Sequence, residues 1–369
     1  MTASSNRGII SWLLAAKLPE PDQFSMRRLA LLLVPAILIA AVGARGATPE
    51  PSARPVVGAP AVSIFYYPWY GTATEDGFYE HWGQYGHRPP DDIAAGFYPA
   101  RGVYSSSDTR VVDAQLAEIA AAGVGEIVVS WWGTASTENA RLPTILDAAR
   151  EHGLTVAIHL EPYPGRSAES TAADIAYLRG LGVDTFYLYQ PQDLPPEDWA
   201  AMNAQLEGVT VYAQTGLAGF ARKGGFAGLY TYDVLTHGAS SIGRICAAAR
   251  LNGLLCAPSV GPGYDARRGS GDLRIKLRRG GATYDAMWRA AIAAAADRVT
   301  ITSYNEWHEG TQIEAAASIA RRGAYRYGTY DGAYGRRGVA AQNAYLERTA
   351  HWSRAFVASS LARVLFGDY

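Results

Sequence analysis

The stretch RVTITSYNEWHEGTQIE, residues 298–314, is the most informative part of the chain for both fold and function. Its first half, Arg298–Ser303, is a β-branched run of the kind that forms a buried strand. Its second half places Glu306 and Glu309 three residues apart among aromatic and histidine side chains. Because burying an unpartnered carboxylate costs several kcal/mol, two of them directly after a strand predict a site for acid and base chemistry.

The spacing of the two carboxylates indicates what that chemistry is. Residues three apart on a helical turn have Cβ atoms about 5–6 Å apart on the same side. Two carboxylates that close repel each other when both are ionised, which raises one pKa and leaves a proton donor beside a base. Glycoside hydrolysis needs such a carboxylate pair. We therefore predict Glu306 and Glu309 as the catalytic residues.

Seven similar runs precede this strand, and Ala- and Leu-rich stretches separate them. The predicted strands are Val62–Tyr66, Glu126–Trp131, Thr155–Leu160, Asp184–Tyr189, Val209–Ala213, Ala227–Thr231, Leu254–Pro258 and Val299–Ser303. The predicted helices are Asp108–Ala122, Thr137–His152, Ala168–Leu181, Pro196–Leu206, Ser240–Leu251, Tyr284–Ala296 and Val339–Leu365. The connection Thr215–Phe226 is short and rich in glycine and gives no clear helix. Eight strand-then-helix repeats favour a (β/α)8 TIM barrel over a doubly wound sheet, as a single catalytic domain over residues 61–369.

Active sites of such barrels lie at the carboxyl ends of the strands, where this chain concentrates aromatic and polar residues. Tryptophan and tyrosine suit sugars because they combine a flat apolar face with a hydrogen-bond donor. In the pair Trp131-Trp132 the side chains alternate, so one ring should face the barrel mouth and the other the helices. The predicted substrate-binding residues are Tyr67, Trp69, Trp131, His159, Glu161, Tyr230, Tyr232, Tyr264, Asn305 and Trp307.

The composition excludes several classes of partner. The chain has 369 residues, 49% of them hydrophobic, with a net charge of -1 and no basic stripe, which argues against nucleic acid. It contains no Cys-x-x-Cys, His-Glu-x-x-His or EF-hand spacing, and neither a Gly-x-Gly-x-x-Gly fingerprint nor a P-loop. We therefore expect no metal, no nucleotide and no other cofactor. Cys246 and Cys256 could form a disulfide or remain two buried thiols, and we favour the thiols.

The N-terminal region reads as a targeting segment. Residues 26–47 combine Met26-Arg27-Arg28, a 14-residue apolar run and a small-residue region, which is typical of a secretory signal peptide. The run is short for a membrane span, which needs about 20 residues, so membrane association is expected only if the segment stays uncleaved as an anchor. Since a signal peptide begins near the start of a protein, we expect Met26 to be the initiator and residues 1–25 to result from an over-extended gene prediction. Residues 48–60 are then expected to form a Pro-rich linker. We expect a secreted, cell-envelope or periplasmic protein.

The sequence motifs of this chain resemble those of glycoside hydrolase family 99, the endo-α-1,2-mannosidases and endo-α-1,2-mannanases. The matching segments occur in family order across about residues 61–320. They are FYYPWYG (65–71), YSS (104–106), HLEPY (159–163), GLYTY (228–232), PSVGPGYD (258–265) and NEWHEGTQIE (305–314).

The resemblance implies a (β/α)8 barrel that cleaves internal α-mannosidic linkages with retention of configuration and without a metal. In the family's scheme the first Glu of the motif deprotonates the sugar 2-hydroxyl, which attacks C1 to give a 1,2-anhydro sugar. The second Glu protonates the leaving oxygen and then activates water. Carried over, Glu306 is the base and Glu309 the acid/base. Glu161 matches a carboxylate of the substrate pocket, and Trp131 and Tyr232 (or Tyr230) match sugar-contacting aromatics. The implied partner is an α-mannan or a mannose-containing oligosaccharide.

Two segments depart from the family pattern. Where a Tyr-Asp-Ser-Tyr run is usual, Tyr189 is followed by Gln190-Pro191-Gln192. Where an Arg-Pro-Trp-Asn-like segment is usual, residues 267–271 read RRGSG. Both lie on the predicted rim and bear on which glycan is accepted. A hydrolase of the same mechanism acting on another α-linked polysaccharide is the alternative, and a non-catalytic carbohydrate-binding barrel is a second one, which the presence of both Glu306 and Glu309 disfavours.

Overall fold

Nine parallel strands form the central sheet of the computed structural model, which describes residues 62–366. Along the sheet the order is β7-β6-β5-β4-β3-β2-β1-β11-β8. These strands are β1 Val62–Tyr66, β2 Glu126–Trp131, β3 Thr155–Leu160, β4 Thr185–Leu188, β5 Thr210–Gln214, β6 Gly228–Tyr230, β7 Leu255–Ala257, β8 Ser259–Val260 and β11 Val299–Ile301. The predicted signal segment, linker and N-terminal extension lie outside the described residues.

The sheet closes on itself at Pro258. This proline, which lacks an N–H, is the last residue of the predicted seventh strand and separates β7 from β8. Strand β7 pairs with β6, while β8 pairs with β11. At the break the Ser259 N–H donates to Thr231 Oγ1 at 2.9 Å. Since β11 also pairs with β1, the parallel ring is continuous, and the predicted (β/α)8 barrel is confirmed.

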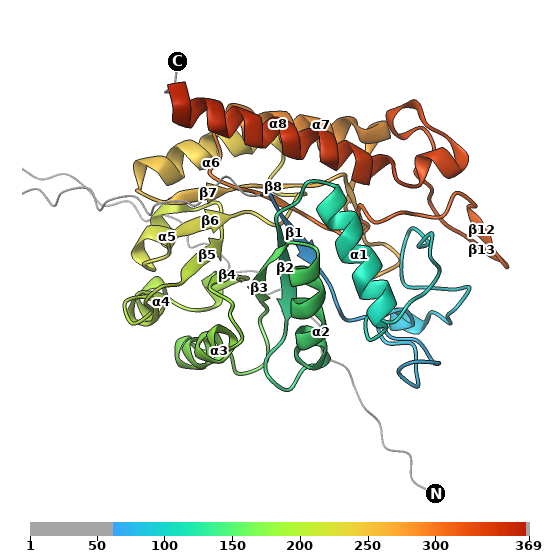
Figure 1. Ribbon diagram of the computed structural model, residues 1–369, viewed down its shortest axis with the longest axis horizontal. Coiled ribbons are helices and arrows are strands. Elements are labelled where there is room, and N and C mark those ends of the chain that lie inside the picture. Colours follow the sequence, from blue (N-terminus) through green and yellow to red (C-terminus); the bar gives the residue numbers. More distant parts are fainter. Residues whose placement is uncertain (1–61, 367–369) are drawn as a thin grey trace, which may run out of the picture. The chain divides into compact units, whose positions relative to one another are not determined.

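The helices surround the strands in Figure 1. They are α1 Thr109–Ala121, α2 Thr137–Glu151, α3 Ala168–Gly180, α4 Pro196–Asn203, α5 Ala218–Lys223, α6 Ala239–Leu251, α7 Ala282–Ala293 and α8 Ala344–Phe366. Short 3-10 turns occur at Gln84–Gly86, Pro191–Asp193, Arg279–Gly281, Ala333–Gly335 and Gly338–Ala341. There are also two small antiparallel hairpins. One pairs β9 Tyr264–Asp265 with β10 Ile275–Lys276, and the other pairs β12 Arg321–Arg322 with β13 Tyr325–Arg326. None of the helices in residues 62–366 has the length and apolar character needed to span a membrane.

Two helices differ from the prediction. The connection that gave no clear helix contains α5, whose Ala218 and Ala221 are buried and small enough to pack against the barrel. The final helix begins at Ala344 rather than Val339, because a 3-10 turn occupies Gly338–Ala341. Neither difference moves a residue of the strand ends.

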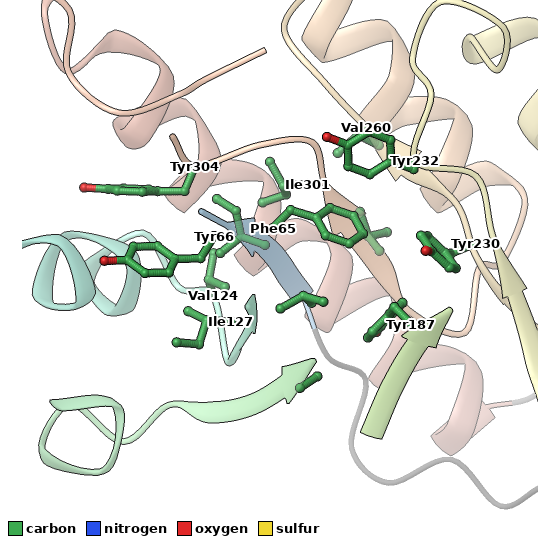
Figure 2. Close-up of a cluster of buried hydrophobic side chains, with 14 of the residues drawn as sticks. Phe65, Tyr66, Val124, Ile127, Tyr187, Tyr230, Tyr232, Val260, Ile301 and Tyr304 are labelled. Atoms are coloured by element: carbon green, nitrogen blue, oxygen red, sulfur yellow. The ribbon is translucent and has the colours of Figure 1, made fainter. Parts of the chain in front are cut away.

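Alternation along each strand separates the barrel interior from the helix layer. On β1 the Phe65 ring lies among the interior aromatics, 5.8 Å from the Tyr230 ring, whereas Tyr66 points to the other side with Tyr304 (Figure 2). At the amino ends of the strands Glu126 and Arg298 form an ion pair of 3.0 Å. The aromatic interior thus supports whatever lies at the opposite, carboxyl end.

Cys246 in α6 and Cys256 in β7 form a disulfide, so the preference for two thiols was wrong. The chain turns back after α6 at Asn252–Leu254 and runs along the helix as β7. This brings the two Cα atoms to 5.2 Å across a separation of only ten residues, a distance that suits a bridge.

Candidate active site

The two predicted carboxylates lie on one turn directly after β11. Ser303 Oγ accepts a hydrogen bond from the Glu306 N–H at 2.8 Å and lies 2.9 Å from Thr311 Oγ1 across the turn. Gly310 has φ +64°, a conformation that favours glycine, and a Cβ there would lie 2.9 Å from the Asp265 carbonyl oxygen. The turn therefore holds both carboxylates at the carboxyl end of the same strand.

Glu306 is held by its own turn. Its side chain is 2% exposed, and Oε1 accepts the His308 N–H at 2.9 Å. The His308 Nε2 lies 3.0 Å from the His81 carbonyl oxygen, which can only accept, so Nε2 carries a proton. The other ring nitrogen, Nδ1, lies 3.3 Å from the same Oε1. Oε1 thus accepts one hydrogen bond from the backbone of its own turn.

Glu309 is half-buried and linked to two tyrosines. The Tyr232 hydroxyl donates to Oε2 at 3.2 Å, and the Tyr67 hydroxyl lies 2.5 Å from that of Tyr232. Burial, followed by the negative charge of Glu306, raises the pKa of Glu309 well above its usual range, and the Tyr232 hydrogen bond opposes this only in part. Burial also raises the pKa of Tyr232, so its phenol stays protonated. The raised pKa favours the protonated form of Glu309, which a proton donor requires.

Glu161 is the third carboxylate, at the end of β3. Ser130 Oγ and His159 Nδ1 both lie 2.8 Å from its Oε1, and His159 Nε2 lies 2.8 Å from the Tyr230 hydroxyl. With Nδ1–H donating to the carboxylate, Nε2 accepts the Tyr230 proton. Both bonds to Glu161 use Oε1, which leaves Oε2 for a ligand.

A pocket of about 100 Å³ opens beside Glu309 and is partly lined by predicted residues. Tyr232 and Tyr264 form part of its wall. Trp69 is half-buried near Tyr67, with ring centroids 4.6 Å apart, and stacks on His81 at 4.5 Å. Segments after β1, β6 and β8 therefore meet around the turn that carries Glu306 and Glu309, called the catalytic turn below.

Two predicted sugar-contacting residues lie away from the mouth. Trp131 is fully buried, and its Nε1 donates to Asn139 Oδ1 of α2 at 2.9 Å, so its ring belongs to the helix layer. Trp132, two residues after the inward-facing Ser130 and 37% exposed, is the ring of the pair on the barrel side. Tyr230, the last residue of β6, is also fully buried. Tyr232, two residues further on, donates to Glu309, and both tyrosines belong to the buried cluster in Figure 2.

Asn305 and Trp307 are fully buried and position the turn instead of facing a ligand. The Asn305 side chain accepts the Tyr67 N–H at 2.8 Å and donates to the Tyr67 carbonyl at 3.0 Å. Trp307 Nε1 donates to Glu314 Oε2 at 3.0 Å. Their predicted role as substrate contacts is thus not supported by their positions.

Behind the turn, Glu314 is completely buried and gathers four donors, although burial raises its pKa. Besides Trp307 these are Arg101 Nε at 2.7 Å, the Tyr104 hydroxyl at 2.8 Å and Gln115 Nε2 at 2.9 Å. A buried carboxylate with this many partners rigidifies the segment that carries the catalytic pair.

The polar or aromatic residues of the pocket wall that the prediction missed include Tyr189, Asp233 and Arg274. Tyr189 ends the predicted strand Asp184–Tyr189, so its position at a strand end was available as a signal. Asp233 and Arg274 lie in irregular segments that carry no periodic pattern. Within residues 62–366 no group of three His, Cys, Asp or Glu side chains is placed to hold a metal ion.

Comparison with known proteins gives a consistent result. The family model for glycosyl hydrolase family 99 matches residues 59–358. A glycoprotein endo-alpha-1,2-mannosidase-like protein of Danio rerio is 35% identical over 313 residues, covering 69% of this chain and 71% of the relative. The glycoprotein endo-alpha-1,2-mannosidase of Xenopus laevis is 32% identical and covers 80% and 76%.

Among solved structures, a GH99 endo-alpha-mannosidase from Bacteroides thetaiotaomicron is similar with a TM-score of 0.74 and 31% identity, covering 82% of this chain and 98% of that one. The range matched by the family model, residues 59–358, includes Glu161, Glu306 and Glu309. The chain therefore belongs to glycosyl hydrolase family 99 and is a glycoside hydrolase of the endo-α-mannosidase type.

Proposed function

We propose that the protein cleaves internal α-1,2-mannosidic linkages with retention of configuration, through a 1,2-anhydro sugar. The observation that carries the proposal is the unequal pair on one turn. Burial and the charge of Glu306 raise the pKa of Glu309 and so favour its protonated form. Glu306 has one oxygen bonded by the His308 N–H, which leaves the other to act as a base. A base and an acid on one turn are close enough to act on one sugar ring, the base at the 2-hydroxyl and the acid at the leaving oxygen.

In the first half of the reaction Glu306 takes the proton of the 2-hydroxyl of the sugar to be cleaved. The 2-oxygen attacks C1 and forms the anhydro ring while the bond from C1 to the leaving oxygen breaks. Glu309 gives its proton to that oxygen. Because the Tyr232 hydroxyl donates to Oε2, Oε1 is the oxygen that carries the proton.

In the second half the roles reverse. Glu309, now ionised, takes a proton from water as the water oxygen attacks C1, and Glu306 returns its proton to the 2-oxygen as the ring opens. Two inversions at C1 give net retention. The free Oε2 of Glu161 is placed to bind a sugar hydroxyl, and Trp132 and Tyr264 offer ring faces for stacking.

The substrate class is an α-mannan or mannose-containing oligosaccharide, as the names of the relatives suggest. Another α-linked polysaccharide is the second candidate, favoured by the altered segments after Tyr189 and Asp265. Digestion of defined α-1,2-, α-1,3- and α-1,6-mannosides, with analysis of product length, separates the two. Release of a disaccharide or larger fragment supports endo action, while release of single mannose units contradicts it.

We also propose that the protein is exported, through the signal-like residues 26–47. The support is their composition alone. Cell fractionation combined with peptide mapping of the mature N-terminus tests this. A mature start after residue 47 in the exported fraction supports cleavage, and a start at Met26 in the membrane fraction indicates an anchor.

The central test of the catalytic assignment is Glu309→Gln. We expect kcat to fall by about 10²–10⁴-fold, the usual contribution of a general acid, with substrate binding retained. The loss should be smaller for a mannosyl fluoride, because fluoride leaves without protonation, whereas Glu306→Gln should impair both substrates. Glu207→Gln, an exposed carboxylate before β5 at the opposite end of the barrel, serves as the control. Hydrolysis of the mannoside by Glu309→Gln at the wild-type rate would refute the assignment.

A further inference from the structure

The hairpin formed by residues 264–278, which contains β9 and β10, packs directly on the catalytic turn. The Asp265 N–H donates to the Glu309 carbonyl oxygen at 2.8 Å. Gly269 lies against His308 so closely that a Cβ there would be 2.3 Å from the His308 carbonyl oxygen. This hairpin includes the RRGSG segment in which the sequence departs from the family pattern.

At the end of the hairpin, Arg278 reaches the same turn. Its NH2 donates to the Gly310 carbonyl at 2.9 Å and to the Gln312 carbonyl at 2.7 Å. These carbonyls follow Glu309 by one and three residues. A guanidinium that bonds both of them fixes the direction in which the backbone leaves Glu309.

Three aromatic rings surround the Arg278 guanidinium. Its central carbon lies 4.8 Å from the Phe97 ring centroid, 4.8 Å from that of Tyr330 and 4.7 Å from that of Tyr345. Tyr330 itself donates to the carbonyls of Gln312 and Glu314. Within residues 62–366 Arg278 forms no ion pair, so ring faces and backbone carbonyls balance its charge.

We propose that Arg278 is a positioning residue for Glu309, held by the Phe97, Tyr330 and Tyr345 rings so that its guanidinium fixes the turn that carries the acid. The inference rests on the proposed role of Glu309. It assigns to the hairpin a task in catalysis: Arg278 holds the turn from one end and the Asp265–Gly269 segment holds it from the other.

The experiment compares Arg278→Met and Arg278→Lys with a matched control, Arg348→Met. Arg348 also lies over aromatic rings, 5.1 Å from those of Tyr334 and Trp352, but its partner is Asp285 and it contacts no residue of the turn. We expect Arg278→Met to lower kcat by about ten- to a hundredfold, the effect of a misplaced catalytic group, with KM changed less than about threefold. Arg278→Lys should recover part of kcat, and Arg348→Met should lower the melting temperature alone.

A second variant approaches the turn from the other end of the hairpin. Gly269→Ala must move the hairpin away from His308, so it should show the same loss of kcat with little change in KM. If Arg278→Met does not fold, Arg278→Lys and Gly269→Ala decide the question. Wild-type kcat in folded Arg278 and Gly269 variants overturns the proposal, even though the wild-type enzyme still cleaves α-mannosides. An inactive wild-type enzyme would instead refute the proposed function.

Discussion

At the level of single residues, the two carboxylates differ because of what each one touches. Glu306 accepts an N–H from its own turn, whereas Glu309 is linked to the Tyr67 and Tyr232 hydroxyls and feels the charge of Glu306. Under the proposed mechanism the same residue type on the same turn therefore has two roles. Because both side chains are glutamates, the difference in their behaviour comes from their hydrogen bonds and their burial.

Tyr232→Phe tests this division. The acid step needs protonated Glu309, so activity is lost as the pH rises through the pKa of Glu309. The Tyr232 hydrogen bond stabilises the ionised form and lowers that pKa, so its removal should move the basic limb of the kcat/KM profile to higher pH. The maximal rate should fall about five- to tenfold, the value of one hydrogen bond.

Measuring kcat/KM against pH for the wild type and for Tyr232→Phe checks this prediction. Tyr284→Phe is the control, because it removes a buried tyrosine hydroxyl that bonds Thr349 far from the pair. A basic limb that stays in place or moves to lower pH in Tyr232→Phe would contradict the assigned hydrogen bond.

Sequence patterns located the chemistry of the site better than its walls. Glu161, Glu306 and Glu309 stand out because charged residues directly after buried strands are rare. The position of Trp131 on the helix side could not be predicted, because period-2 alternation places neighbouring rings on opposite faces without saying which face is inside. Arg278 escaped notice because its partners, Phe97, Tyr330 and Tyr345, are far apart in the sequence.

At the level of elements, the sequence predicted eight barrel strands and seven of the eight helices. The strands were predictable because a parallel barrel strand is buried on both faces and appears in the sequence as a continuous β-branched and aromatic run. What the pattern could not supply is how neighbouring elements meet. The Cys246–Cys256 bridge depends on the tight turn from α6 into β7, and the split at Pro258 depends on different partners for β7 and β8.

The bridge between α6 and β7 leads to a prediction about stability. Replacing both cysteines by alanine should lower the free energy of unfolding by about 2–3 kcal/mol, because a closed loop of about ten residues restricts the unfolded chain. Thermal melting with and without a thiol reductant measures this, and kcat at low temperature should be unchanged. A wild-type melting temperature that does not respond to complete reduction, verified by thiol labelling, would contradict it.

At the level of the whole molecule, the barrel is stabilised at one end and strained at the other. Glu126 and Arg298 form an ion pair at the amino ends of the strands. At the carboxyl ends Glu309 lies near Glu306 without a cationic partner among the bonds of its side chain. Catalytic sites commonly reduce stability in this way.

Glu309→Gln should therefore be more stable than the wild type at neutral pH, by on the order of 1 kcal/mol. Since the folded-state pKa of Glu309 is raised, the folded protein binds more protons than the unfolded chain as the pH rises above the usual glutamate value. Wild-type stability falls across that window, and the glutamine variant avoids the loss.

Denaturant unfolding from pH 4 to 8 measures the difference, which should shrink at the acidic end of the range. Glu207→Gln should show no such gain. A Glu309→Gln protein that is less stable than the wild type at pH 7 would show that Glu309 is not a strained group.

The pairing of β11 with β1, which closes the barrel, also has a consequence for synthesis on the ribosome. Strands β1 to β6 emerge in the order in which they pair, each beside its predecessor, while the ring closes only when Val299 of β11 pairs with Val62 of β1. Glu306 and Glu309 emerge immediately after that last strand. Such distant pairing is slow compared with local contacts, so the growing polypeptide can assemble the candidate site only after the last strand of the barrel, β11, has been made.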